Sequence, residues 1–103
     1  MTIAFEPGEE IRANVDSKTE FYAKALSWRE QRRFIAQVEE LKKLETEEAQ
    51  TDAALQAISD RVTRTVPAME IAPDTLSNVL DYKHIWNLLA ALEFNLSHDE
   101  KKT

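Results

Sequence analysis

The residues of this sequence best suited to metal binding are two histidines and the acidic residues beside them. His84 and His98 show neither the H-x-x-x-H nor the H-E-x-x-H spacing of helical metal sites. His98, Asp99 and Glu100 are adjacent, and adjacent side chains on a helix point in different directions, so they cannot easily converge on one ion. Asp81 stands three residues before His84, the spacing of a contact at a helix start. We expect no metal site.

Nucleophiles and phosphate-binding loops are equally poorly represented. The chain has no cysteine, which removes thiolate nucleophiles, thiolate zinc sites and disulfides together. Its single glycine, Gly8, rules out a P-loop or a dinucleotide fingerprint, since both need several glycines. The acidic pairs fall on predicted polar faces, whereas general acid–base catalysis needs carboxylates held in a cleft. The sequence therefore predicts a protein that is not an enzyme and takes no cofactor.

Length and charge narrow the remaining functions. A chain of 103 residues is enough for one domain with one core. The formal net charge of −6 disfavours binding to nucleic acid or to anionic membranes. The longest apolar cluster, "IWNLLAALEF", is too short to cross a bilayer, and the N-terminus has no secretory signal. We expect a soluble protein of the cytoplasm whose partners are proteins, with oligomerisation left open.

Residues 1–26 are expected to be extended or β. Pro7-Gly8 is typical of a type II turn, with weakly alternating apolar residues on both sides, which indicates a short hairpin or two extended segments. Ser17 and Glu20 would also suit a helix start. We favour extended structure over residues 19–26, because a helix continuing past Ser27 would place its aromatic residues opposite the next apolar stripe.

Residues 27–65 are predicted to form a helical hairpin. Ser27 and Glu30 make a capping box, and a helical apolar stripe follows at Phe34, Ile35, Val38, Leu41 and Leu44. A second helix is expected to start at Thr46 or Thr51 and to run to about Arg64. Its small side chains at Ala53, Ala54 and Ala57 favour close approach to a neighbouring helix. One uninterrupted long helix is the alternative.

Residues 74–95 are predicted to hold the C-terminal helices. Asp74 is expected to cap a short helix, and the next apolar set falls about 170° away from the first on a continuous helix. Either the helix breaks at Asp81, which we favour, or it is sandwiched between two partners and offers spare apolar surface to one of them. Residues 97–103 are expected to form a short helix, capped by Ser97 with Glu100, or a frayed tail. The predicted fold class is mainly α: three to five helices with a helical hairpin after a short β-hairpin or extended segments.

Tryptophan and arginine are enriched at binding hot spots, and this suggests a set of candidate partner-binding residues. Arg32 and Arg33 lie opposite the apolar stripe of the first helix, and Trp28 lies on its flank. The alternative is that Trp28 packs over the helix entrance while glutamates neutralise the arginines. On the last long helix an aromatic residue could seal the core edge or face a partner. The candidates are Trp28, Arg32, Arg33, Trp86 and Phe94.

Two segments carry a resemblance to a known family. "ALSWRE" at 25–30 resembles the L-[ST]-x-R-E helix entry of small proteins encoded among the tail genes of long-tailed bacteriophages. "NLSHDEKK" at 95–102 is similar to the L-S-x-x-D/E-x-K ending of such proteins. The order of the segments is also similar, so the chain resembles a phage tail assembly chaperone over most of its length. Only Ser27, Arg29 and Glu30 can be carried over from the motif, and these look structural.

This resemblance implies a non-enzymatic function. Tail assembly chaperones coat the aggregation-prone tape-measure protein, assist polymerisation of tail-tube subunits around it, and are lost from the mature particle. A small acidic phage inhibitor or adaptor is an alternative, and its binding face would be residues 39–52. A minor structural component of the virion is another. Co-purification distinguishes these classes, since each brings down different proteins.

Overall fold

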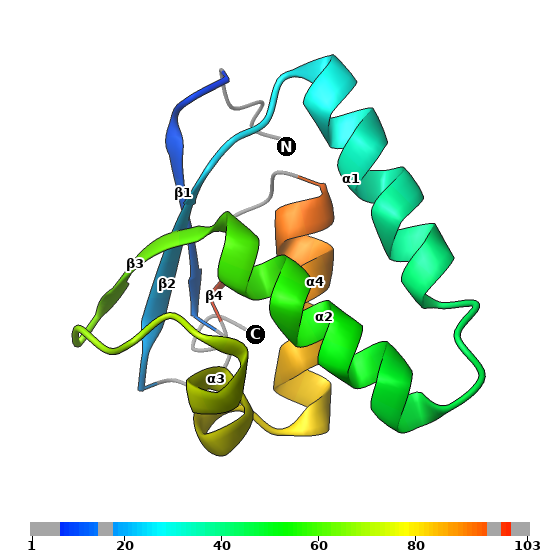
Figure 1. The fold of residues 1–103 in the computed structure, drawn as a ribbon. Helices are drawn as coiled ribbons and strands as arrows, with labels where there is room; N and C mark the ends of the chain where they lie inside the picture. The colour runs from blue at the N-terminus through cyan, green and yellow to red at the C-terminus, as the bar shows by residue number, and fades with distance from the viewer. Residues whose placement is uncertain (1–6, 15–17, 95–97, 100–103) are drawn as a thin grey trace.

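In a computed structural model, described for residues 7–14, 18–94 and 98–99, the chain forms a sheet covered on one face by helices (Figure 1). The elements follow the order β1 (Glu10–Asn14), β2 (Glu20–Lys24), α1 (Trp28–Leu41), α2 (Glu47–Arg61), β3 (Val62–Val66), α3 (Pro73–Val79), α4 (Tyr82–Glu93) and β4 (His98–Asp99). The mainly α prediction is wrong, because the antiparallel strands β1, β2 and β3 make this a mixed α/β protein. None of the described helices combines the length and the apolar character needed to cross a bilayer.

The sheet is built on the segment that we expected to be extended. Its strand order is β3-β2-β1-β4, with β1 antiparallel to β2, and β2 antiparallel to β3. Ile11 and Ala13 on β1, and Phe21 and Ala23 on β2, are buried and alternate with more exposed residues, as a sheet with one covered face requires, and only Asn14 at the end of β1 departs from the pattern. The positive φ of Gly8, +89°, is that of a turn just before β1, but the strand predicted before this turn lies outside the described residues.

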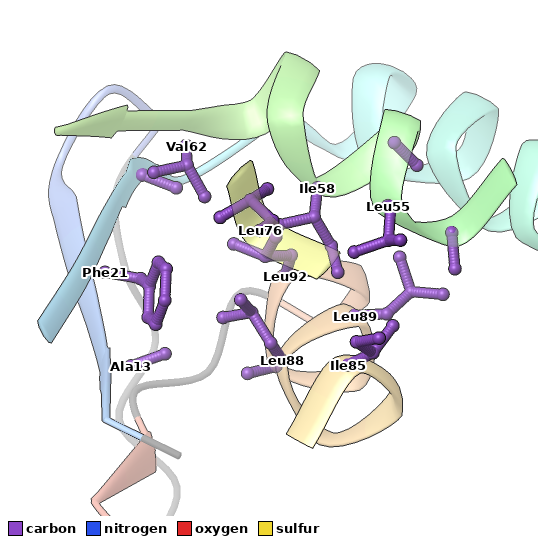
Figure 2. Packing of buried hydrophobic residues seen from close by; sticks show 14 of the residues in the cluster. Ala13, Phe21, Leu55, Ile58, Val62, Leu76, Ile85, Leu88, Leu89 and Leu92 are labelled. Atoms are coloured by element: carbon purple, nitrogen blue, oxygen red, sulfur yellow. The ribbon is translucent and has the colours of Figure 1, made fainter. Parts of the chain in front are cut away.

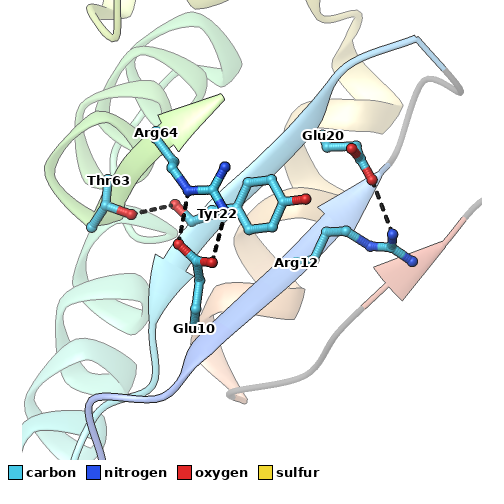
Figure 3. Close-up of polar contacts among 6 residues, drawn as sticks. All are labelled: Glu10, Arg12, Glu20, Tyr22, Thr63 and Arg64. Carbon is cyan, nitrogen blue, oxygen red and sulfur yellow. Dashed lines mark hydrogen bonds and ion pairs between the residues drawn. The ribbon is translucent and has the colours of Figure 1, made fainter. Parts of the chain in front are cut away.

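The uncovered face of the sheet carries charged residues paired with one another (Figure 3). The Arg64 guanidinium donates to both carboxylate oxygens of Glu10, at 3.0 and 2.8 Å, while it lies 3.8 Å from the centre of the Tyr22 ring. Its hydrogen bonds lower the pKa of Glu10 and raise that of Arg64. Arg12 donates to Glu20 at 3.0 Å on the same face. These cross-strand pairs keep this face polar.

Strand β3 was not anticipated. The second helix was expected to reach about Arg64, but α2 ends at Arg61 and the chain continues directly into Val62–Val66. These residues pair with β2, and their β-branched side chains suit a strand better than a helix end. The register shifts between Tyr22 and Ala23. The segment that leads to α3 therefore begins only after Val66, the last residue of β3.

Helix α1 begins where the apolar face changes sides. Ser27 accepts from the Glu30 N–H at 3.3 Å, and the Glu30 carboxylate accepts from the Ser27 N–H at 3.2 Å, so both halves of the predicted capping box are present. The Ser27 hydroxyl also donates to the Glu30 carboxylate at 2.8 Å, and this hydrogen bond, followed by that from the Ser27 N–H, holds the pKa of Glu30 below its usual value. Within the predicted stripe, Phe34, Val38 and Leu41 are buried, whereas Leu44 lies beyond the helix and is exposed. The chain break predicted at Ser27 is confirmed.

Loss of this cap should be measurable. Ser27→Ala removes the acceptor for an otherwise unpaired N–H at the start of α1, and we expect the free energy of unfolding to fall by about 0.5–2 kcal/mol. Urea denaturation followed by circular dichroism measures the change. Ser77→Ala is a suitable control, because Ser77 is exposed and its hydroxyl only donates to the Asp74 carbonyl within α3. Equal stability of wild type and Ser27→Ala would rule out an energetic contribution of the cap.

The C-terminal helices also separate at the predicted residue. Asp81 accepts from the His84 N–H at 2.8 Å and starts α4. The cap predicted for the preceding helix is wrong, because α3 begins after Ala72 with Pro73 at its first position and Asp74 in its first turn. The final short helix is also wrong at His98–Asp99, which pair with β1 as a parallel strand. Ser97 and residues 100–103 lie outside the described part.

The core gathers around α4 (Figure 2). This helix contacts β1, α1 and α2, and it buries Ile85, Leu88, Leu89 and Leu92. Helix α2 approaches it closely through Ala54 and Ala57, both fully buried. The close helix neighbour predicted from these alanines is thus chiefly α4 rather than α1. The break at Asp81 turns most apolar residues of both C-terminal helices into this one core, whereas Val79 and Tyr82, on either side of the break, stay exposed.

Arg61 joins four elements at the end of α2. Its guanidinium lies 4.8 Å from the Phe34 ring centre on α1. It donates to the Leu92 carbonyl on α4 at 2.9 Å and to the Lys24 carbonyl on β2 at 3.1 Å. Burial lowers the pKa of Arg61, an effect that Glu30 partly offsets. This one side chain therefore links the sheet to helices α1, α2 and α4.

Candidate functional site

The partner-binding residues predicted on α1 lie on the surface. Trp28 is 71% exposed, so it does not pack over the helix entrance as the alternative reading had it. The Arg32 guanidinium lies 5.3 Å from the centre of its ring, a cation–π arrangement. Arg33 is exposed on the same helix. The start of α1 thus presents an aromatic ring together with positive charge.

The two predicted aromatic residues on α4 have different environments. Phe94, just after the helix, is 51% exposed. Gln31 donates to the neighbouring Glu93 carbonyl at 3.3 Å, so Phe94 lies at the same end of the molecule as the start of α1. Trp86 is half-buried against the core, with its ring 6.1 Å from that of Tyr82 and its indole N–H buried without a partner. Trp86 therefore seals the core edge and does not join the other candidates.

A concave site lies elsewhere, between α2, α3 and the start of α4. It is an open groove of about 430 Å³, within the roughly 300–1,000 Å³ common for binding sites. Leu55 and Ile85, which are 3% and 4% exposed, form its floor, and the ring of Tyr82, which is 53% exposed, is its exposed apolar side chain. The Asp81 cap sets the entry of α4 and so positions Tyr82 and Ile85 beside α2. The residues that line the groove are Glu47, Glu48, Thr51, Asp52, Leu55, Ser77, Tyr82 and Ile85.

One side of this groove is strongly acidic. Glu47 and Glu48 lie in the first turn of α2, where the helix dipole favours negative charge. Asp52 lies one turn further on and gains less from the dipole. Within the described residues none of the three forms an ion pair, so their charges are not neutralised by the chain's own lysines and arginines. The groove combines an apolar surface with an acidic rim.

Several polar groups in and near the groove are engaged in local contacts. Two of its three hydroxyl groups are engaged within their own helices: Thr51 donates to the Glu47 carbonyl at 2.8 Å, and Ser77 to the Asp74 carbonyl at 2.7 Å, while the third is the phenol of Tyr82. No histidine is among the lining residues. His84 instead lies with Nδ1 3.2 Å from the Asp81 carboxylate, the local helix-start contact expected from its spacing. Across residues 7–14, 18–94 and 98–99, no group of three potential ligands is placed to hold a metal ion.

One buried carboxylate lies near the C-terminus of α4. Glu93 is only 6% exposed, and burial, reinforced by the charge of Glu39 and opposed by that of Lys42, raises its pKa. A carboxylate whose pKa is raised on folding stabilises the fold below its unfolded pKa, and this contribution is lost as the pH rises through the folded pKa. At neutral pH the ionised Glu93 therefore costs stability.

This predicts a pH-dependent gain from Glu93→Gln. The variant should melt at a higher temperature than wild type at pH 7, because no charge is buried. The difference should shrink as the pH falls through the raised folded pKa, and it should be small below the ordinary glutamate pKa of about 4.3, where the carboxyl is neutral in both the folded and the unfolded state. Thermal melts across this range test it, with the exposed Glu45→Gln as control. A melting temperature at pH 7 that is higher for wild type than for Glu93→Gln would contradict this prediction.

Sequence reasoning missed the groove but not all of its residues. Glu47, Glu48 and Asp52 belong to the acidic stretch 39–52, which was predicted as the binding face of an inhibitor or adaptor. Leu55, Tyr82 and Ile85 were assigned to helices without being connected, since their meeting depends on how α2 and α4 pack. Comparison with known protein families, curated proteins and solved structures finds no match, so the surface geometry and the resemblance at residues 25–30 and 95–102 are what bear on function.

Proposed function

We propose that this protein is a non-enzymatic binding protein that holds a segment of another protein in the groove between α2, α3 and α4. The observation that carries the proposal is the pairing of an apolar surface at Leu55, Tyr82 and Ile85 with an unneutralised acidic rim at Glu48 and Asp52. Such a groove favours a basic amphipathic segment, which places an apolar side chain inside and lysine or arginine against the rim. Helix-in-groove recognition of this kind needs no catalytic group.

The specific form we propose is a tail assembly chaperone acting in the cytoplasm of an infected bacterium. The resemblance at residues 25–30 and 95–102 supports it, and so does the groove, because a chaperone for an amphipathic helical client needs apolar surface outside its own core. The client would be the tape-measure protein, with tail-tube subunits as further partners. The net charge of −6 helps to keep such a complex soluble.

Affinity purification from infected cells tests this function. The tagged wild type should recover the tape-measure protein, and Glu48→Arg/Asp52→Arg should lose it. Glu40→Arg/Asp60→Arg makes the same change in charge on α1 and α2 outside the groove, and it should bind like wild type. Specific, groove-dependent recovery of a host protein would instead favour the acidic adaptor. Recovery of neither tail proteins nor assembly intermediates would refute the chaperone.

A further inference from the structure

The start of α1 carries its own apolar anchor and positive charge. Trp28 is 71% exposed, and Arg29, Arg32 and Arg33 are exposed around it. No ion pair is formed by these three arginines within the part of the chain that the structure describes. We refer to Trp28, Arg29, Arg32 and Arg33 as the α1 patch. An exposed tryptophan amid arginines has the composition of a binding hot spot rather than of a solvated helix end.

The α1 patch and the groove are complementary in chemistry. The groove offers apolar surface at Leu55, Tyr82 and Ile85, beside which an aromatic ring can be buried. Its rim offers Glu47, Glu48 and Asp52, three carboxylates for three guanidinium groups. Arginine binds carboxylates through a fork of paired N–H groups, so such contacts are strong as well as attractive at long range.

The two surfaces cannot meet within one chain. The α1 patch lies at the first residue of α1, whereas the groove lies beyond its last residue, at the start of α2 (Figure 1). Helix α1 has 14 residues and so separates its own two ends by about 21 Å. Both surfaces are therefore left for contacts with other molecules.

We propose that copies of this protein associate by inserting the α1 patch of one copy into the groove of another. Trp28 lies on the apolar surface of the groove, and the arginines pair with Glu47, Glu48 and Asp52. The contact joins two different surfaces, so it can build a closed pair or an open chain, and the mass of the wild-type assembly distinguishes them. The proposal shares the groove with the function above but does not depend on the identity of the client.

Sedimentation of wild type and two variants tests this contact. The patch variant Trp28→Ser and the groove variant Glu48→Arg/Asp52→Arg should each associate at least about 30-fold more weakly than wild type, since a hot-spot residue contributes about 2 kcal/mol or more. Each variant keeps one surface intact. A 1:1 mixture should therefore form a heterodimer through the groove of the first and the patch of the second, although each variant alone is monomeric.

The outcomes are decisive in both directions. The altered residues are exposed, and circular dichroism verifies that each variant is folded; Glu40→Arg/Asp60→Arg should associate like wild type. A wild type that stays monomeric up to about 1 mM overturns the proposal, as do variants that associate normally or fail to pair when mixed. Because affinity purification from infected cells reports on the client separately, failed self-association leaves the chaperone function standing, and loss of client recovery leaves the self-association standing.

Discussion

Phe21→Ala should destabilise the protein by about 3–5 kcal/mol, the largest effect that we expect from a single substitution. Phe21 is 1% exposed on β2, and its ring projects from the sheet towards the helices (Figure 2). Truncation removes buried apolar area and leaves a cavity at the junction of the two layers. A domain of this size has about 5–15 kcal/mol of stability in total, so the variant should be partly unfolded under mild conditions.

Phe94→Ala is the matched control for this substitution. It deletes the same ring from a residue that is 51% exposed at the end of α4, and its effect should stay within about 0.5 kcal/mol. Urea denaturation of the two variants measures the difference directly. If Phe21→Ala lost less than about 1 kcal/mol, the sheet and helices would not share the core described here.

Arg61→Ala should have the next largest effect, a loss of about 2–4 kcal/mol. The substitution leaves the Lys24 and Leu92 carbonyls without their charged donor and removes the cation from the Phe34 ring. The Leu92 carbonyl lies near the end of α4, where the helix itself supplies no further N–H group. The variant would thus lose the side chain that links the sheet to the helices.

Two further variants separate this role from simple loss of charge. Arg61→Lys keeps the charge but has no planar fork, so it should recover only a minor part of the lost stability. Arg64→Ala removes another arginine that lies over an aromatic ring and pairs with a carboxylate, but this pair is about half exposed and screened by water, so its loss should cost much less stability. Equal losses of stability for Arg61→Ala and Arg64→Ala would contradict the role of Arg61 in linking the sheet to the helices.

The breaks at Ser27 and Asp81 could be predicted because their signals are local. Each is a capping residue placed where the apolar periodicity changes face, and both caps are present in the structure. Strand β3 could not be located in this way. Val62 and Val66 continue the helical stripe of Leu55 and Ile58, so the pattern alone favours a longer helix. Pairing with β2, some 40 residues earlier in the chain, decides the conformation of this segment.

The candidate site was predictable only in its chemical components. Trp28, Arg32 and Arg33 were identified by residue type, and their exposure follows from their position opposite the apolar stripe. The same reasoning did not separate Trp86 from them, because a residue on the flank of a stripe can be buried or exposed. The run V-T-R-T-V before Pro67, rich in β-branched residues, was the available signal for β3 and hence for a mixed fold.

The uncovered face of the sheet carries ion-paired side chains, so the two faces of the molecule differ in their capacity to bind a partner. The Glu10–Arg64 and Arg12–Glu20 ion pairs connect strands β1, β2 and β3. The charges in these pairs are already partnered within the chain. The groove and the α1 patch both belong to the helical layer. Under the proposed contacts, each copy would turn its helices towards its partner and its strands towards water, so an assembly built through them would be a single layer thick.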